Sequence, residues 1–163
     1  MIFKVEGDIL LSKAYAIAHG VEKNDPMNKC LALELNNKYP AMRADFHRWC
    51  HQHNTKLGEV WLWTGPNNTH IVHLITQESL EINDHLHDKA TLNNIRHALT
   101  ALEKIIITEK LTSIALPRIA TGVGDLEWDD VWPLIENSLG NLAIPVYVYV
   151  KYIAGKMADE PIV

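Results

Sequence analysis

The chain has 163 residues, which predicts one globular domain over residues 1–163 rather than two. Hydrophobic residues make up 47% of the sequence and charged residues 21%, a composition that excludes intrinsic disorder. Lysine and arginine number 15 and aspartate and glutamate 20, so the net charge is −5, which argues against non-specific binding to nucleic acid.

Strand-like and helix-like segments alternate along the first half of the chain. In order, we expect a strand at 2–6, a short buried strand at 14–18, helices at 31–39 and 41–53, and strands at 60–64 and 71–76. Pro40 separates the two helices, because proline opens a helix better than it continues one. The sequence Gly65-Pro66-Asn67-Asn68 is a strong turn signal and makes the last two strands an antiparallel pair.

The second half begins with the clearest helical pattern of the chain. In order, we expect a helix at 90–109, a strand at 113–116, a helix at 131–139 and a strand at 145–150. Apolar residues recur at steps of three and four in the first of these helices, at Leu92, Ile95, Leu99, Leu102 and Ile106. Pro133 fits a first helical turn, which predicts Asp129 or Asp130 as the N-cap, and Gly140 lies where a C-cap belongs.

This alternation, with one antiparallel hairpin inserted, predicts an α/β fold: a three-layer α/β/α sandwich with a mixed, mostly parallel central sheet. In such sheets a ligand sits in the crevice beyond the carboxyl ends of the strands. A turn with two glycines, Gly122 and Gly124, follows one strand there and precedes a helix. Its backbone N–H groups can form a concavity for an anion such as phosphate, although a tight turn without a ligand explains the same spacing equally well.

Asp8 directly follows the first predicted strand. A carboxylate at that place can accept a hydrogen bond from the exocyclic amine of a base, or it can cap the next turn. Taken with the glycine turn, the motifs in chain order are Gly7-Asp8-Ile9-Leu10, Ala18-His19-Gly20, Leu74-Ile75-Thr76, Leu116-Pro117-Arg118-Ile119, Gly122-Val123-Gly124 with Trp128, and Val148-Tyr149. This combination resembles the macrodomain family over about residues 2–151, leaving residues 152–163 as a C-terminal tail. Within the family it looks most like the branch of terminal ADP-ribose glycohydrolases and DNA ADP-ribosyl glycohydrolase antitoxins.

The resemblance implies a pocket for ADP-ribose. Asp8 would accept the adenine amine, the Ile9 N–H would bond a ring nitrogen, and Tyr149 would lie near the adenine. The diphosphate would be wrapped by backbone amides of one loop, formed by Ile119, Ala120, Thr121, Gly122, Val123 and Gly124. The remaining implied ligand-binding residues are His19, Thr76, and Lys29 and Cys30 beside the distal ribose.

Two departures from the family pattern concern catalysis and the ribose loop. The first loop contains Asn28-Lys29-Cys30 in place of glycines, and Gln77 stands where the glycohydrolase branch has a lysine nucleophile. An amide cannot form a Schiff base with the ribose, so that covalent route is closed at this position. Asp125 as acid or base and Lys89 on a polar segment are the remaining catalytic candidates, although Asp125 can equally cap the turn and Lys89 can be a solvated charge.

Histidines are numerous, and one cluster resembles half of a zinc site: His47, Cys50, His51 and His53. The Cys50 and His51 side chains diverge on a helix, and no matching pair follows at finger spacing, so we predict no metal and no cofactor.

The longest apolar runs, at residues 9–11 and 105–107, are too short to span a membrane, and the first residues lack the pattern of a signal peptide. Two cysteines fit a reducing compartment. We therefore expect a cytoplasmic protein without membrane contacts, and its small, acidic chain fits a monomer.

Three functions are compatible with these residues. The first is a hydrolase that removes ADP-ribose from a protein or a nucleic-acid end, and the second is a module that binds ADP-ribose-type groups without turnover. The third is a nucleotide-binding regulatory subunit with no preference for ADP-ribose. The partner in the first two is ADP-ribose or an ADP-ribosylated macromolecule.

Overall fold

The structure, a computed structural model, describes residues 1–79, 90–122 and 125–162, and its elements follow the predicted order. The strands are β1 (Ile2–Gly7), β2 (Ala16–Glu22), β3 (Val60–Gly65), β4 (Thr69–Gln77), β5 (Ile114–Leu116) and β6 (Val146–Tyr152). The helices are α1 (Cys30–Lys38), α2 (Ala41–His53), α3 (Leu92–Thr108) and α4 (Trp128–Leu139), with short 3-10 turns at Ile9–Leu11 and Pro66–Asn68.

The six strands of the described residues form one sheet in the order β1-β6-β5-β2-β4-β3. All neighbouring pairs are parallel except the β3–β4 hairpin, which is antiparallel. The predicted mixed, mostly parallel sheet and the antiparallel pair are therefore confirmed. Because five neighbouring strands run the same way, their carboxyl ends meet at one edge of the sheet.

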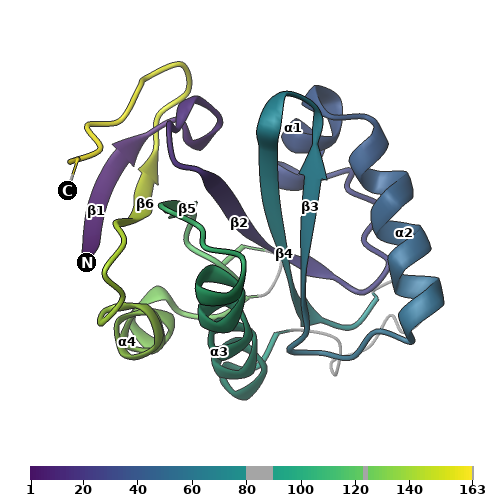
Figure 1. The fold of residues 1–163 in the computed structure, drawn as a ribbon. Helices are drawn as coiled ribbons and strands as arrows, with labels where there is room; N and C mark the ends of the chain where they lie inside the picture. The colour runs from purple at the N-terminus through teal and green to yellow at the C-terminus, as the bar shows by residue number, and fades with distance from the viewer. Residues whose placement is uncertain (80–89, 123–124, 163) are drawn as a thin grey trace.

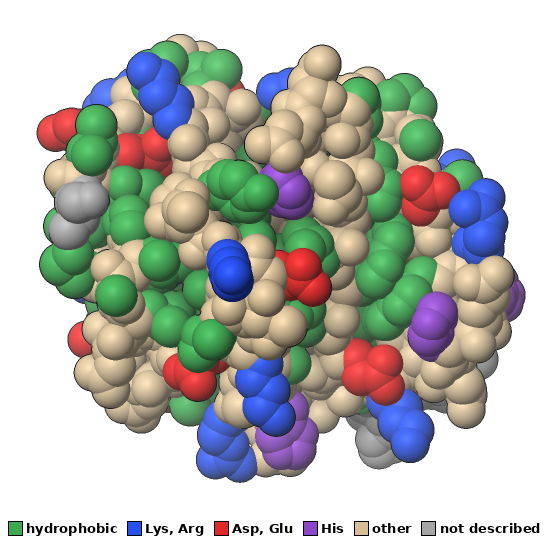
Figure 2. All heavy atoms as spheres, in the orientation of Figure 1, with side chains coloured by type: hydrophobic (Ala, Val, Ile, Leu, Met, Phe, Trp, Pro, Cys, Tyr) green, Lys and Arg blue, Asp and Glu red, His purple; other side chains and the backbone are tan. Residues whose placement is uncertain are grey.

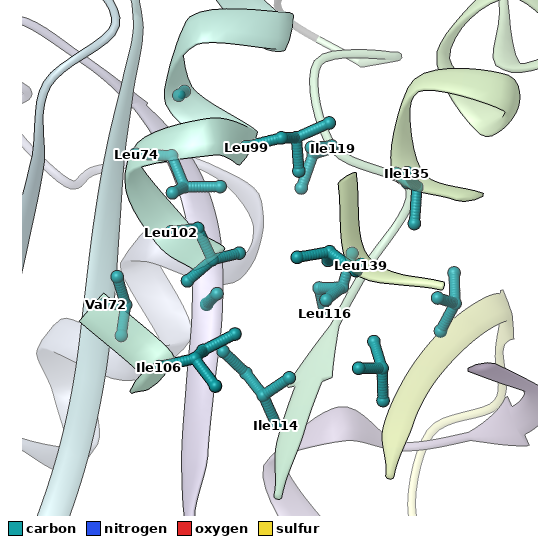
Figure 3. Packing of buried hydrophobic residues seen from close by; sticks show 14 of the residues in the cluster. Val72, Leu74, Leu99, Leu102, Ile106, Ile114, Leu116, Ile119, Ile135 and Leu139 are labelled. Atoms are coloured by element: carbon teal, nitrogen blue, oxygen red, sulfur yellow. The ribbon is translucent and has the colours of Figure 1, made fainter. Parts of the chain in front are cut away.

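Helices α3 and α4 cover one face of this sheet. Val72 and Leu74 of β4 pack there with Leu102 of α3 and Leu139 of α4 in one apolar cluster (Figure 3). The predicted stripe of α3 is buried at Ile95, Leu99, Leu102 and Ile106, whereas Leu92 at its start is 39% exposed. Burial of this stripe fixes the helix against the strands that lead into the cleft described below.

Two different sets of segments pack on the opposite face of the sheet. Ile71 and Ile75 of β4, which alternate with the residues of the first face, pack with Leu35 of α1 and Phe46 of α2. Over β1, β5 and β6, Ile9 of the short 3-10 turn and Ala158 of the C-terminal segment form the apolar cluster, and Leu31 of α1 packs at its edge. Figure 1 shows α1 and α2 beside β3 and β4, and the yellow C-terminal segment beside β1 and β6. The three-layer α/β/α sandwich is thus confirmed.

Two predicted boundaries are wrong. Strand β2 begins at Ala16 and continues to Glu22, because its ladder with β4 extends through His19 and Gly20, residue types that are uncommon within strands. Helix α4 begins at Trp128 with Glu127 as N-cap, so Asp129 and Asp130 lie in the first turn and Pro133 lies inside the helix. Negative charge in a first turn is favourable to the helix dipole, which explains the earlier start. Gly140 is the C-cap, as predicted.

One face of the molecule shows charged side chains of both signs among apolar and neutral ones (Figure 2). On the face shown in Figure 2, basic and acidic side chains alternate with apolar and neutral ones. No helix among the described residues is long and apolar enough to cross a membrane. The described surface therefore directs attention to the strand ends rather than to a charged patch.

Candidate functional site

A cleft of about 470 Å³ lies at the carboxyl ends of β2, β4, β5 and β6. Its lining includes the end residues of β2, β4 and β6, together with the loop that follows β5 and the segment that leads into α1. This is the edge of the sheet at which the sequence predicts a ligand. The sheet order therefore arranges the lining groups from β6 at one end of the cleft to β4 at the other.

Gly20 and Thr76 line the middle of the cleft, where β2 and β4 run side by side. A Cβ atom at Gly20 would lie 3.4 Å from the Thr76 side chain and 3.9 Å from the Ala120 nitrogen. The Thr76 hydroxyl donates to the Val21 carbonyl at 3.3 Å, which directs it to the backbone of the neighbouring strand. The glycine therefore keeps the lining open between β4 and the loop after β5.

His19 and Gln77 are buried polar residues at the β2 and β4 end, with exposed fractions of 2% and 4%. The Nε2 atoms of both side chains have no hydrogen-bond partner in the described part of the chain. Burial lowers the pKa of His19 to about 4, so its ring is neutral at pH 7. Buried polar atoms without partners are costly, and a bound polar ligand can satisfy them.

The ring of His73 is fully buried and packs edge-on against that of His19, with 4.8 Å between the two ring centres. Burial and the neighbouring His19 lower the pKa of His73 well below its ordinary value. Neither of its ring nitrogens has a partner among the described residues. This end of the cleft is therefore polar but carries no positive charge on its histidines at neutral pH.

The loop after β5 lines the cleft from Pro117 to Gly122. Two local hydrogen bonds stabilise the loop. Leu126 N–H donates to the Ala120 carbonyl at 2.9 Å, and the Thr121 hydroxyl donates to the Arg118 carbonyl at 2.9 Å. Ala120 has φ of +62°, which turns the backbone sharply. No hydrogen bond found in the described ranges uses the N–H groups of residues 119–122, so these donors are available to a ligand.

The loop also leaves space at its centre. A Cβ atom at Gly122 would meet no heavy atom of the described residues within 4 Å. Beside it, the Arg118 guanidinium lies 5.4 Å from the centre of the Trp128 ring, which packs beneath this segment. Val123 and Gly124, which the sequence assigns to the same loop, lie outside the described residues.

The β6 end of the cleft is aromatic. Tyr149 and Tyr152 both line it, and the Tyr152 side chain is 62% exposed. Sequence analysis missed Tyr152 because the last strand was expected to end at residue 150. Gly7 pairs with Tyr152 in the sheet, so Asp8 and Ile9 lie next to this end, although neither lines the cleft itself. The Asp8 carboxylate accepts bonds from the N–H groups of Leu10 and Gly155, both at 3.0 Å.

Two carboxylates, Glu22 and Asp25, line the cleft where β2 ends, and sequence analysis missed both. Asp25 accepts bonds from the N–H groups of Glu22 and Met27 at 3.0 and 2.7 Å, which shapes the turn. Burial raises the pKa of Asp25, while these bonds and the nearby His47 and Lys29 act against that rise. Glu22 is the last residue of β2 and Asp25 lies three positions later, and neither belongs to a motif that the sequence analysis singles out.

Lys29 and Cys30, which the family resemblance assigns to the distal ribose, both line the cleft. Cys30 begins α1 with φ of +50° and has an exposed free thiol. Asp125, in contrast, is exposed and does not line the cleft; its N–H donates to the Gly122 carbonyl at 3.0 Å. Lys89 lies outside the described residues, so the structure does not place the two catalytic candidates together.

The histidine cluster of α2 does not form a metal site. The His47 ring nitrogen lies 2.8 Å from the Asp25 carbonyl oxygen, and the His53 ring nitrogen lies 3.0 Å from the Trp49 carbonyl oxygen. Across residues 1–79, 90–122 and 125–162, no group of three or more potential metal-ligating side chains comes together. These two histidines therefore have structural partners in the backbone.

The fold and the cleft define a class: α/β/α sandwiches that hold a ligand beyond the carboxyl ends of a mostly parallel sheet. The Macro domain family model matches residues 18–135, and the chain belongs to this family. The family resemblance found in the sequence is thereby confirmed. Among solved structures, the macrodomain of Mycobacterium tuberculosis DarG has a TM-score of 0.82 at 23% identity, covering 91% of this chain and 97% of that one.

Curated relatives include two types of protein. A DNA ADP-ribosyl glycohydrolase of Mycobacterium tuberculosis is 26% identical over 136 residues, which are 80% of this chain but 36% of the relative. Human ADP-ribose glycohydrolase OARD1 is 24% identical over 146 residues, 89% of this chain and 88% of the relative. A Thermosipho africanus DarTG structure in complex with ADP-ribose has a TM-score of 0.80 at 23% identity, covering 96% of this chain and 42% of that one. The chain thus spans well under half the length of the bacterial relatives.

Proposed function

We propose that the cleft binds ADP-ribose or an ADP-ribose derivative. Three kinds of group follow one another along the sheet edge: tyrosine rings at β6, unused backbone N–H groups after β5, and neutral polar side chains at β2 and β4. Aromatic rings suit a base, convergent amides suit a diphosphate, and neutral polar groups suit the hydroxyls of a sugar. This order matches the order of chemical groups in ADP-ribose.

The observation that carries the proposal is the set of unused N–H groups at residues 119–122. Backbone donors in a turn form an anion site without requiring a charged side chain, which suits a protein whose net charge is −5. Lys29, which also lines the cleft, supplies a positive charge for the same diphosphate. The names of the relatives OARD1 and DarTG, the latter solved with ADP-ribose, support the same ligand.

Calorimetry tests this assignment with ADP-ribose, ADP, AMP and ATP. We expect ADP-ribose to bind more tightly than the other three, because only ADP-ribose carries a second ribose, beyond the diphosphate, whose hydroxyls can bond to His19 and Gln77. A comparable affinity for ATP would instead support a general nucleotide site, and no binding of ADP-ribose would contradict the proposal.

We propose further that the chain binds this group without the lysine-dependent turnover of the glycohydrolase branch. The supporting observation is Gln77, a buried amide at the position where the branch has its lysine nucleophile. Incubation with ADP-ribosylated DNA and protein should release no ADP-ribose. A Gln77→Lys variant that gains release would indicate that the rest of the cleft is competent, and release by the wild type would contradict binding without turnover.

A hydrolase is the second candidate, and the glycohydrolase names of the curated relatives favour it. Asp125 and Lys89 would be its acid–base and charge-stabilising groups. Release that is lost in both Asp125→Ala and Lys89→Ala would support these roles, whereas release that survives both substitutions would contradict them. Under either candidate we propose that residues 1–163 form a single domain, that it is monomeric and that it works in the cytoplasm; sedimentation of the purified chain tests the oligomeric state.

A further inference from the structure

The C-terminal segment 153–162, here called the strap, runs back along the end of β1 after leaving β6. Ile153 N–H donates to the Gly7 carbonyl at 3.0 Å, and Asp8 N–H donates to the Lys156 carbonyl at 2.7 Å. Gly155 N–H donates to the Asp8 carboxylate at 3.0 Å. The strap thus forms hydrogen bonds with both the backbone and the side chain at the turn that follows β1.

Glu160 ties the strap to two further elements. Its Oε2 atom accepts bonds from the Ser12 hydroxyl at 2.6 Å and the Tyr149 hydroxyl at 2.8 Å. Its Oε1 atom accepts a bond from the Lys13 N–H at 2.9 Å. One carboxylate therefore joins the 12–13 turn to Tyr149, which lines the cleft.

The strap is docked as part of the core rather than as a movable lid. Ala158 is 9% exposed and packs in a cluster with Val5, Ile9 and Tyr149. A Cβ atom at Gly7 would lie 2.7 Å from the Lys156 carbonyl oxygen, so the two backbones touch with no room for a side chain. A segment held by buried apolar contact and by at least six hydrogen bonds stays in place when a ligand binds.

We propose that Glu160 is a positioning residue for the base end of the cleft, which it holds in the geometry that receives the base. This inference rests on the proposed function, because it concerns the same ligand. Glu160 does not line the cleft, and it acts through Tyr149 and through the turn that carries Asp8 and Ile9. Prior fixing of these groups lowers the cost of ordering them around a base. A ligand that has no base gains nothing from Glu160.

The test compares Glu160→Ala, Glu160→Gln and Asp159→Ala in the otherwise intact chain. Asp159 is the matched control, since it removes the same charge from an exposed neighbouring position of the strap. We expect Glu160→Ala to lower the affinity for ADP-ribose and for AMP by about tenfold, which is the effect of losing one or two hydrogen bonds. Ribose 5-phosphate, followed by NMR titration, should bind the variant and the wild type equally. Glu160→Gln should restore most of the affinity, because hydroxyls can donate to or accept from an amide.

Three outcomes would overturn the assignment. Equal ADP-ribose affinity in Glu160→Ala and the wild type would show that the base end does not depend on this carboxylate. An equal loss for all ligands, ribose 5-phosphate included, would indicate a general structural role only. If the wild type binds ribose 5-phosphate but neither ADP-ribose nor AMP, the proposed function itself fails; if it binds ADP-ribose normally and only the selective loss is missing, the positioning role alone fails.

Discussion

The two ends of the cleft satisfy their polar groups in opposite ways. At the β6 end, the Asp8 carboxylate and the Tyr149 hydroxyl are hydrogen-bonded to the chain's own strap. At the β2 and β4 end, His19 and Gln77 each keep a buried side-chain nitrogen without a partner among the described residues. The first end is complete without a ligand, whereas the second remains incomplete.

This difference separates stability from recognition within one site. Satisfied polar groups hold a shape and contribute to the free energy of unfolding, so changes at the β6 end should be felt by the fold. Unpaired buried groups reduce that free energy and are retained where a ligand uses them. Four experiments can break or sharpen this contrast, and they follow from the largest expected effect to the smallest.

Gly7→Val should lower the free energy of unfolding by about 3 kcal/mol, because overpacking here forces two backbones apart. The new Cβ would lie 2.7 Å from the Lys156 carbonyl oxygen and 2.9 Å from the Ala158 nitrogen. Urea unfolding measures the change. Gly122→Ala is the control, since its Cβ meets no heavy atom within 4 Å in the part of the chain that the structure describes, and it should leave stability unchanged. A Gly7→Val variant as stable as the wild type would contradict the tight docking of the strap.

Acid should destabilise the fold through the histidines of the incomplete end. Burial lowers the pKa of His19 to about 4 and also lowers that of His73, so the folded chain takes up these protons later than the unfolded chain. Stability is therefore full above the unfolded pKa of about 6.5 and falls as pH drops below it, by about 2 kcal/mol at pH 5 for His19. Urea unfolding at pH 7 and pH 5 measures this loss.

A neutral substitution identifies the source of that pH dependence. His19→Gln should reduce the fall between pH 7 and pH 5 and leave only the part that His73 contributes. An equal slope in the His19 variant and the wild type would show that His19 is not the group that titrates.

Tyr152→Ala should weaken ADP-ribose binding by about tenfold, because stacking of a base on an aromatic ring is worth about 1–3 kcal/mol. Its ring is 62% exposed, so the same change should leave the unfolding midpoint almost unchanged. Tyr152→Phe keeps the aromatic face and should bind as the wild type does in calorimetry. If phenylalanine binds as weakly as alanine, the ring does not stack on the ligand.

Gln77→Met should have the smallest effect and the opposite sign on stability. An apolar side chain of similar shape removes a buried Nε2 group that has no partner among the described residues, so we expect a gain of about 1 kcal/mol in the free energy of unfolding. The same variant should lose affinity for ADP-ribose but not for ADP. Thermal unfolding and calorimetry on one preparation measure both changes, and a loss of stability would mean that the amide has a structural partner.

Much of this fold could be predicted from local patterns. The alternation of β4 and the spacing of Ile95, Leu99 and Leu102 specify which side of each element is buried, and proline and glycine mark the ends. The loop at residues 119–122 could also be predicted from the local sequence, since its glycine follows the end of a strand. The local pattern predicted the wrong bounds for β2, because His19 and Gly20 lie inside this strand although such residues usually mark a strand end.

The strap and half of the cleft lining could not be predicted, because they depend on contacts between distant residues. The bonds from Ser12 to Glu160 and from Gly155 to Asp8 join residues 148 and 147 positions apart. No periodicity or motif encodes such a pair. Glu22 and Asp25 were missed for a related reason: an acidic segment after a strand is ordinary until the fold places it against a loop from another strand.

Gly20 offers a practical handle on the biology of this chain. A methyl group there would make an ordinary 3.4 Å contact with Thr76 without forcing the backbone to shift, yet it would stand in the floor of the cleft. We therefore expect Gly20→Ala to leave the free energy of unfolding almost unchanged and to reduce the space available to a ligand. Paired with a ligand analogue trimmed at the matching atom, this variant would give a bump-and-hole system for assigning cellular effects to this one protein.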